Sequence, residues 1–295
     1  PTPFKGDDAR IDWDALERLI EFQIENGSHG LSCTGTTGEP SSLTRDERKA
    51  VVEFVKEKVA GRVPFVPGTG SNNVDETLEL TRHAVELGVD GVLVIAPYYV
   101  RPNQNGLYEY FARVAREVAA VDPQVPVILY NIPGRAAVDI APRTMGRLRR
   151  DHPNVVGVKH ATKNLDDVSY TFLAAGRDFA VYCGAETMTY PMLTLGGAGH
   201  ISATGVVAPR AVARIYELAA AGRWDEARDL HFEMLELNDV LFIEVNPVPL
   251  KTALSLMGLC EARWRLPLGP MLPENRAKLV ATLERYGLVG EGAPA

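Results

Sequence analysis

Short apolar runs alternate with longer amphipathic runs along most of the chain. The short runs predict β-strands at residues 28–33, 63–68, 91–96, 125–131, 155–160, 179–184 and 199–203. The longer runs carry apolar residues at helical spacing and predict helices at 12–26, 44–60, 74–87, 106–120, 141–150, 165–175, 187–195 and 209–221. This alternation predicts parallel strands joined by crossover helices. Because the strands are apolar on both faces, a (β/α)8 barrel is preferred over the alternative, a doubly wound open sheet.

Local signals support several of these boundaries. Thr44, with Glu47 three residues later, has the pattern of a capping box at a helix start. Gly27 and Gly88 directly follow helical runs and predict helix ends.

The pattern supplies seven barrel strands and then changes. Residues Pro1–Phe4 read as the tail of an additional first strand, whose upstream half would precede Pro1. From Gly222 onward the pattern predicts helices only, at 224–242, 248–258 and 273–286, and a frayed tail at 290–295. We therefore expect a barrel over residues 1–221, with its first strand truncated, and a C-terminal helical extension over residues 222–295.

Composition narrows the class of protein. The 295 residues are 46% hydrophobic and 23% charged, with a net charge of −7, as in a soluble globular protein that does not bind nucleic acid or anionic membranes as its main partner. No apolar run approaches the ~20 residues of a membrane span, and residues 1–5 lack a signal-peptide pattern. Cys33, Cys183 and Cys260 lie far apart without metal-ligand spacing, which favours a reducing cytoplasm.

Lys159 is the lysine that its local sequence predicts to be buried. It ends the apolar run Val155–Val158, whereas the other lysines, Lys251 among them, lie in charged, helix-like or loop-like stretches. Burial disfavours the charged ammonium and favours the free amine, which attacks carbonyl groups to form a Schiff base. The alternative is a strand-end lysine that reaches solvent or pairs with a carboxylate.

Other polar residues follow the predicted strands, at the barrel face where active sites form. The turn Gly35–Glu39 offers hydroxyls and free N–H groups suited to a carboxylate or phosphate, although an ordinary strand-to-helix turn explains it as well. Tyr130 could exchange protons with Lys159, or it could simply pack in the barrel. Arg135 could hold a substrate carboxylate, and the adjacent pair Tyr98 and Tyr99 suggests a subunit contact.

Two further polar residues are expected to be structural. His160 should point away from the lumen if Lys159 points into it, because side chains alternate along a strand. Glu186 fits a helix N-terminus better than a catalytic role. The sequence contains no metal cluster, Ser-His-Asp triad or nucleophile elbow, so we expect neither a metal nor a cofactor.

These motifs resemble a known family. The segments 35–39, 97–99, 130–135 and 157–159 occur in the order found in dihydrodipicolinate synthases, which belong to the N-acetylneuraminate lyase family of pyruvate-dependent class I aldolases. The resemblance extends from Thr2-Pro3 to the C-terminal helices, where segments 246–251 and 265–268 also look like synthase sequence.

The resemblance implies roles for eight residues. Lys159 would form the imine with pyruvate, and Tyr130, Thr36 and Tyr99 would relay protons, Tyr99 entering from a neighbouring subunit. The substrate would be held by Thr37 at the pyruvate carboxylate, by Arg135 at the aldehyde's carboxylate, and by the backbone of Gly184 and Ile201. The partners would be pyruvate and L-aspartate 4-semialdehyde, the product 4-hydroxy-tetrahydrodipicolinate, on the route to lysine and diaminopimelate, and the assembly a homotetramer of tight dimers.

Two alternatives remain open at this point. An aldolase or dehydratase for a 2-oxo-3-deoxy sugar acid would use the same Lys159 and Tyr130, although Thr36, Thr37 and Arg135 favour the synthase. A barrel that has lost catalysis and serves only to bind a ligand is the other alternative, and the intact set of Lys159, Tyr130, Thr36 and Tyr99 argues against it.

The chain departs from the synthase pattern at three places. His160 stands where an acidic residue usually follows the catalytic lysine. Pro40-Ser41-Ser42 follows the Gly38-Glu39 pair, where many synthases carry a small polar residue. The third departure concerns the lysine feedback pocket. Positions Tyr98, Asn72 and Glu76 match lysine-sensitive relatives, whereas Pro40, Arg45 and Arg48 do not. An arginine repels a cationic ligand, so we predict weak or absent inhibition by lysine.

Overall fold

A parallel sheet forms the centre of the molecule in the computed structural model, which describes residues 1–290. The strands follow one another in sequence order: β3 (Val92–Ile95), β4 (Val127–Asn131), β5 (Val155–His160), β6 (Ala180–Cys183) and β7 (Gly199–His200). Two extended segments continue the sheet beyond β3, through the parallel bridges Gly68–Leu93 and Leu31–Phe65. The consecutive order and single direction are those of a (β/α) barrel, and they exclude the doubly wound alternative.

The strands expected at 28–33 and 63–68 are reduced to these isolated bridges. Pro64 and Pro67 have no N–H group and interrupt the ladder of donors. The remaining backbone groups still pair, because Val66 N donates to Leu31 O at 2.9 Å and Gly68 N to Cys33 O at 2.8 Å. The chain therefore runs along the barrel at both places without forming regular strands.

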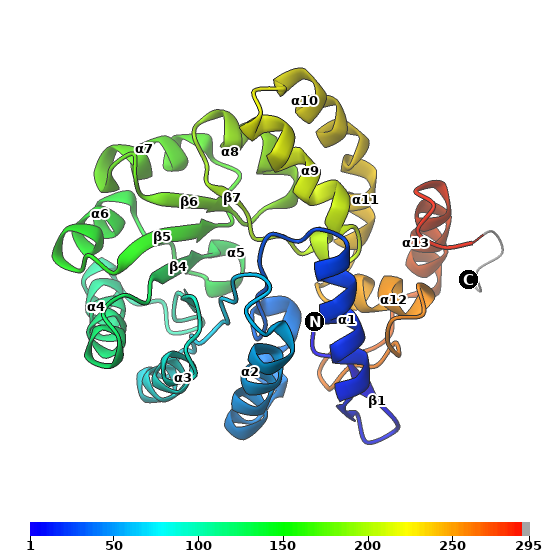
Figure 1. Cartoon of the computed structure of the whole chain (residues 1–295), viewed down its shortest axis with the longest axis horizontal. Coiled ribbons are helices and arrows are strands. Elements are labelled where there is room, and N and C mark those ends of the chain that lie inside the picture. The colour runs from blue at the N-terminus through cyan, green and yellow to red at the C-terminus, as the bar shows by residue number, and fades with distance from the viewer. Residues whose placement is uncertain (291–295) are drawn as a thin grey trace.

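Helices surround the sheet, as Figure 1 shows. They are α1 (Trp13–Glu25), α2 (Arg45–Val59), α3 (Val74–Glu86), α4 (Gln104–Val121), α6 (Pro142–Asp151), α7 (Leu165–Ala175), α8 (Thr189–Thr194) and α9 (Pro209–Ala220). Thr44 and Glu47 form the predicted capping box at α2. Gly27 and Gly88 adopt positive φ angles just after α1 and α3, as predicted for helix ends.

Short helices follow several strands and shape the loops there. They are η1 (Thr36–Gly38), η2 (Pro40–Ser42), α5 (Pro133–Ala136), η3 (Glu186–Met188) and η4 (Thr204–Val206). The sequence pattern did not predict α5, because a single turn is too short to show a period.

The N-terminal segment differs from the expected barrel strand. Phe4–Lys5 (β1) pairs antiparallel with Arg10–Ile11 (β2) in a small hairpin instead of joining the parallel sheet.

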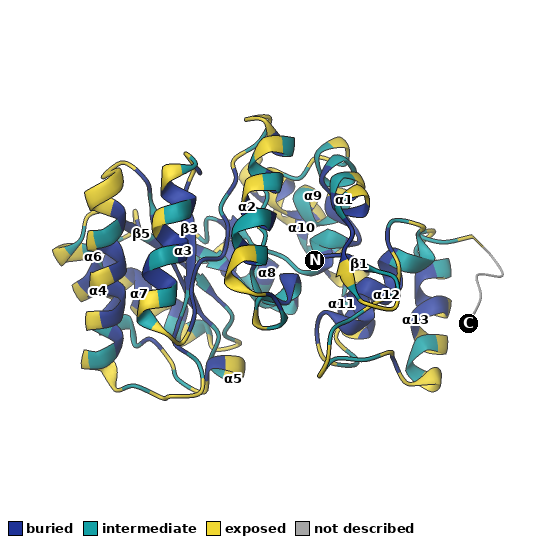
Figure 2. Cartoon of the chain, turned by 90° about the horizontal axis from the view of Figure 1, so that it is seen from below, coloured by how far each residue is buried: buried dark blue, intermediate teal, exposed yellow. Residues whose placement is uncertain are grey.

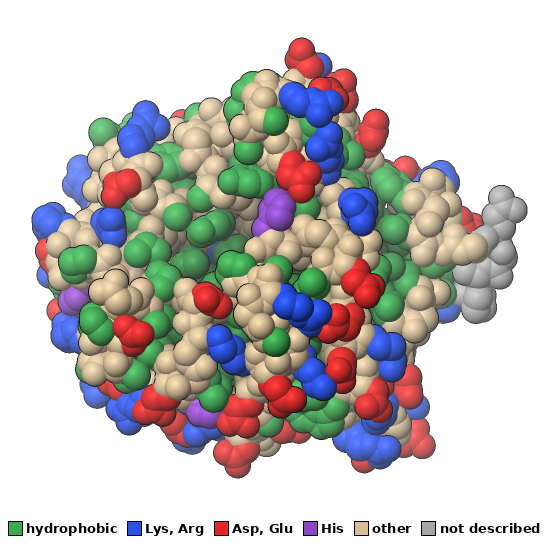
Figure 3. All heavy atoms as spheres, viewed as in Figure 1, with side chains coloured by type: hydrophobic (Ala, Val, Ile, Leu, Met, Phe, Trp, Pro, Cys, Tyr) green, Lys and Arg blue, Asp and Glu red, His purple; other side chains and the backbone are tan. Residues whose placement is uncertain are grey.

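Between the segment at Leu31 and strand β7, the described residues form a cavity of about 490 Å³. In space-filling view, hydrophobic side chains surround the hollow centre of this face, and charged side chains gather around its rim (Figure 3).

The C-terminal extension is helical, as expected: α10 (Trp224–Glu233), α11 (Leu235–Leu241), α12 (Val248–Leu256) and α13 (Pro273–Arg285). The single helix expected over 224–242 is instead two helices that meet at Met234. Leu254 and Leu279 of the extension share one hydrophobic core with Leu19 of α1 and Leu218 of α9. The extension thus packs against the barrel helices with its buried faces turned inward (Figure 2). Most of the tail expected at 290–295 lies outside the described residues.

None of the helices in the described part of the chain is long and apolar enough to cross a membrane.

Candidate active site

Lys159 lies between two tyrosines on the lumen side of the barrel. Its Cα is in register with Tyr130 of β4 and with Tyr182 of β6, and both tyrosines belong to the small apolar cluster of the lumen. The preceding residue, Val158, belongs to the core beneath the helices instead. The Lys159 Nζ lies 4.4 Å from the centroid of the Tyr130 ring. The strand therefore delivers the amine into the barrel, as expected from the sequence.

Gly184 packs against the stem of this lysine. A Cβ atom built on Gly184 would lie 3.1 Å from both Cγ and Cε of Lys159, closer than ordinary van der Waals contact. The missing side chain at Gly184 thus gives the lysine its room.

The turn after the second barrel segment brings two threonines beside the lysine. Thr36 Oγ1 and the Tyr130 hydroxyl lie 3.3 Å apart, within hydrogen-bond distance. Thr36, Thr37 and Ile201 line the same cavity as Lys159. Because η1 begins here, its first N–H groups have no hydrogen-bond acceptor within the helix and can donate to a bound anion. The structure therefore brings these sequence-predicted residues together.

Arg135 reaches the same region through an unexpected residue, Asn246. The Arg135 side chain is exposed on the short helix α5, and its Nη2 donates to Asn246 O at 2.9 Å. The Asn246 side chain donates through Nδ2 to Thr37 Oγ1 at 3.0 Å. Asn246 thus connects the two residues expected to hold carboxylates, and its place in a synthase-like segment was the only sign of this in the sequence.

The placement expected for Lys251 is wrong. This residue is fully buried on α12, and its Nζ forms an ion pair of 2.7 Å with Oε1 of Glu39. Burial lowers the pKa of Lys251, while the Glu39 carboxylate opposes that shift. The chain therefore contains a second lysine that points into the protein interior, and the helical pattern of its own segment did not predict this burial.

Tyr99 does not join the site within its own chain. It is 84% exposed, and its backbone has a positive φ of 75°. Tyr98, directly before it, is half-buried. Within its own chain, Tyr99 is therefore separate from the cavity that Lys159, Thr36 and Thr37 line.

His160 and Glu186 are placed as the sequence suggested. His160 is in register with Asn131 on the side away from Lys159, and it is 1% exposed. Burial lowers its pKa, and neither ring nitrogen has a hydrogen-bond partner within residues 1–290. Glu186 starts η3 and accepts hydrogen bonds from Ser202 Oγ at 2.7 Å and Ala203 N at 2.6 Å. It therefore joins the loops after β6 and β7.

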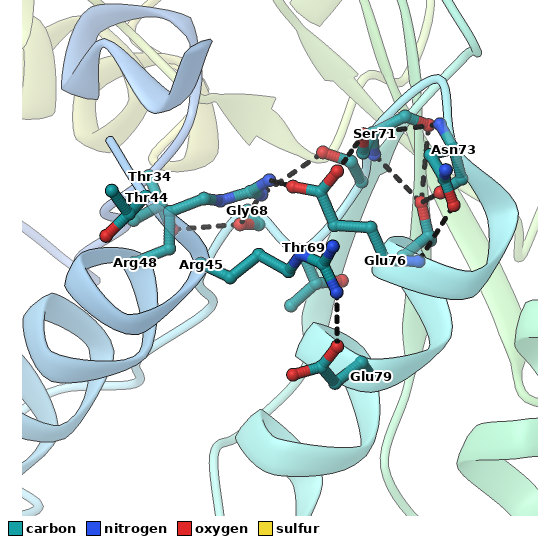
Figure 4. Close-up of polar contacts among 12 residues, drawn as sticks. Thr34, Thr44, Arg45, Arg48, Gly68, Thr69, Ser71, Asn73, Glu76 and Glu79 are labelled. Carbon is teal, nitrogen blue, oxygen red and sulfur yellow. Dashed lines mark hydrogen bonds and ion pairs between the residues drawn. The ribbon is translucent and has the colours of Figure 1, made fainter. Parts of the chain in front are cut away.

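Three of the residues expected to shape a lysine pocket, Arg45, Arg48 and Glu76, form polar contacts in the region of α2 and α3 (Figure 4). The buried Arg48 donates to Glu76 Oε1 at 3.2 Å, to Gly68 O at 3.3 Å and to Gly70 O at 3.1 Å. Arg45 points to Glu79 instead, at 3.1 Å. Burial lowers the pKa of Arg48, whereas Glu76 raises it. The Glu76 carboxylate is thus already paired with a cationic side chain of the protein itself, that of Arg48.

The part of the chain that the structure describes contains no group of three or more His, Cys, Asp or Glu placed to hold a metal ion.

Comparison with known proteins identifies relatives along the whole chain. The model of the dihydrodipicolinate synthetase family matches residues 1–286. The 4-hydroxy-tetrahydrodipicolinate synthase of Thermus thermophilus is 55% identical over 289 residues, which cover 98% of this chain and 95% of the relative.

Solved structures agree with this match. The crystal structure of the Aquifex aeolicus dihydrodipicolinate synthase superposes with a TM-score of 0.94 at 43% identity, covering 99% of this chain and 97% of the other. The synthase of Cyanidioschyzon merolae, solved with lysine bound, has a TM-score of 0.92 at 35% identity and covers 98% of this chain and 96% of that one. These likenesses confirm the (β/α)8 barrel with a helical C-terminal extension. On this family match and these identities, the chain belongs to the dihydrodipicolinate synthetase family.

Proposed function

We propose that the chain condenses pyruvate, held as a Schiff base on Lys159, with L-aspartate 4-semialdehyde to give 4-hydroxy-tetrahydrodipicolinate. It is a lyase of the class I, pyruvate-dependent type, and its relatives carry the synthase name. The observation that supports the assignment to Lys159 most strongly is its position. The amine lies 4.4 Å from the ring of Tyr130, whose hydroxyl contacts Thr36 at 3.3 Å. A nucleophile and a proton carrier therefore lie next to each other in the barrel.

The residues around Lys159 divide the work. Its amine attacks the pyruvate ketone, and water leaves as the imine forms. The imine acidifies the methyl group, which loses a proton through Tyr130 and Thr36 to give an enamine. The enamine carbon attacks the aldehyde, and the new alkoxide takes up a proton from Tyr130. The substrate's amine then attacks the imine carbon, which closes the ring and releases the lysine.

Carboxylate binding falls to Thr37 and Arg135. Thr37 and the free N–H groups of η1 hold the carboxylate of pyruvate, next to the imine. The exposed guanidinium of Arg135 holds the carboxylate of the incoming aldehyde, which arrives from solvent. Gly184 and Ile201 border the imine with their backbone and leave room for the lysine stem.

Tyr99 completes the proton relay in a neighbouring subunit. With 84% of its surface exposed and with Val100 beside it 56% exposed, Tyr99 forms a projecting apolar loop that a second copy of the chain can accept. We infer a tight dimer that exchanges these loops, and a tetramer built from two such dimers.

The cysteines fit a protein of the cytoplasm, since Cys33, Cys183 and Cys260 are free thiols.

The network around Arg48 supports the prediction of weak or absent inhibition by lysine. Lysine bound near Glu76 would have to displace Arg48 from the carboxylate and from two backbone carbonyls. The Arg48 guanidinium already makes the contacts with the Glu76 carboxylate and the backbone carbonyls that a bound cation would otherwise make.

An aldehyde panel tests the proposed reaction. The protein is incubated with pyruvate and either L-aspartate 4-semialdehyde or a set of sugar aldehydes, and the condensation product is identified by mass spectrometry. We expect the cyclic product only with the semialdehyde. Efficient turnover of a sugar aldehyde, without turnover of the semialdehyde, would instead support the sugar-acid aldolase.

A further inference from the structure

The carboxylate-binding turn is attached to the C-terminal extension at two points. Asn246 bonds to Thr37 at 3.0 Å, and Lys251, five residues later, pairs with Glu39 at 2.7 Å. Glu39 directly follows η1, which holds Thr36 and Thr37, and also precedes η2. The position of the Glu39 side chain is therefore coupled directly to the backbone of the turn that carries both threonines.

The backbone of Glu39 requires such an anchor. Its φ of 54° and ψ of 45° lie in the left-handed region, which is unfavourable for a residue that carries a Cβ atom. Such a conformation persists only where the surroundings fix it. The Glu39 carboxylate is nearly inaccessible, and its Oε1 bonds to Lys251 Nζ. The ion pair thus keeps a strained residue next to the proposed substrate loop.

Stability alone does not account for this pair. Taking two charges out of water offsets much of their attraction, so buried ion pairs add little stability compared with uncharged side chains of similar size. The Lys251 ammonium also lies 4.2 Å from the ring of Phe4, and Glu39 Oε2 has no hydrogen-bond partner within the described residues. A pair that costs so much to bury and leaves one oxygen unsatisfied fits a role in positioning.

We propose that the buried Lys251–Glu39 ion pair positions the Thr36–Thr37 turn for binding the pyruvate carboxylate. Lys251 and Glu39 are positioning residues that touch no substrate themselves. The C-terminal extension is then part of the working site. This inference rests on the proposed function, in which Thr37 binds pyruvate next to Lys159.

The test removes the charges and keeps the shapes. Two variants are compared with the wild type: Glu39→Gln, and the double variant Glu39→Gln with Lys251→Met. A matched control replaces a second ion pair of the extension, that of Arg265 with Glu47 of α2, which forms two bonds of 2.7 and 2.8 Å; the Arg265 guanidinium lies 4.6 Å from the same Phe4 ring. The control is Arg265→Met with Glu47→Gln.

Three quantities are measured for each protein: the thermal midpoint, the kcat and KM for pyruvate, and the pyruvate concentration that gives half-maximal borohydride-trapped adduct. We expect KM and the half-maximal concentration to rise about tenfold or more both in the single variant Glu39→Gln and in the double variant, with kcat changed much less. We expect the control to lose stability while KM stays unchanged.

Each outcome decides the proposal. A folded E39Q variant, or a folded double variant, with the wild-type KM and half-maximal concentration would overturn it, as would an equal rise of KM in the control. If the double variant does not fold, the isosteric E39Q variant alone decides. If the wild type itself forms no adduct, the proposed function fails instead, which keeps the two failures apart.

Discussion

Removal of Arg48 should create a lysine-responsive site, which we predict to be weak or absent in the wild-type protein. The Arg48 side chain is 4% exposed, and its ion-pair partner Glu76 is 26% exposed. Arg48→Ala would leave the Glu76 carboxylate and the carbonyl of Gly70 without the partner that they have now. The variant should be less stable, by about 2–4 kcal/mol, because it leaves a partly buried charge unpaired.

The contacts of Arg48 also set the cost of displacing it from this pocket. One bond runs to a carboxylate and two run to the carbonyls of Gly68 and Gly70. At ordinary strengths for such bonds, the three together oppose a competing cation by roughly 3–6 kcal/mol. This corresponds to a factor of about 10²–10⁴ in Kd. Lysine at millimolar concentration should therefore leave the wild type unaffected.

Thermal unfolding in a lysine titration measures this effect. We expect lysine to raise the Tm of the Arg48→Ala variant and to leave that of the wild type unchanged, because only in the variant does the Glu76 carboxylate lack its pairing arginine. Arg45→Ala is the matched control, since Arg45 is exposed and pairs with Glu79 rather than with Glu76. Strong inhibition of the wild type by lysine would refute the reasoning, and so would a Tm of Arg48→Ala that does not respond to lysine.

Four other changes test the account. Tyr130→Phe should lower kcat by about 10²–10⁴-fold while borohydride trapping of pyruvate persists, since it removes a proton carrier and leaves the amine; unchanged kcat would exclude the relay. Gly184→Ala should slow adduct formation, measured by the same trapping, because the new Cβ would displace the stem of Lys159. Mixing the inactive variants Tyr99→Phe and Lys159→Met should restore activity in hybrid oligomers, whereas no restoration would place Tyr99 outside its neighbour's site. Burial lowers the pKa of His160 below its ordinary value of 6.5, so the unfolded chain binds more protons as the pH falls below that value. Urea unfolding should show stability decreasing as the pH falls through this range, and His160→Leu should flatten that decline.

The sequence predicted best those elements whose own residues set their boundaries. Strand β5 and helix α7 begin and end where the pattern placed them. The capping box at Thr44 is also local, so a few residues of sequence suffice to predict it. Local chemistry of this kind is visible without the fold.

The errors arose where distant segments decide the outcome. Lys251 lies in a helix-like stretch whose local pattern did not show which face would be buried, and α12 packs with that residue turned onto Glu39, which lies 212 positions earlier. The bond between Asn246 and Thr37 spans 209 positions and is equally invisible to a local pattern. The prolines at 64 and 67 were visible, but their effect depended on which N–H groups the barrel would need. Strand alternation, by contrast, placed His160 correctly, since it needs only the direction of Lys159.

The most direct test of the central claim is the position of the pyruvate adduct. The protein is incubated with pyruvate, reduced with borohydride, digested and mapped by mass spectrometry. We predict one adduct, on Lys159, and none on Lys251, which is fully buried and held by Glu39. An adduct on a different lysine, or no adduct at all, would contradict the assignment of Lys159 as the Schiff-base residue.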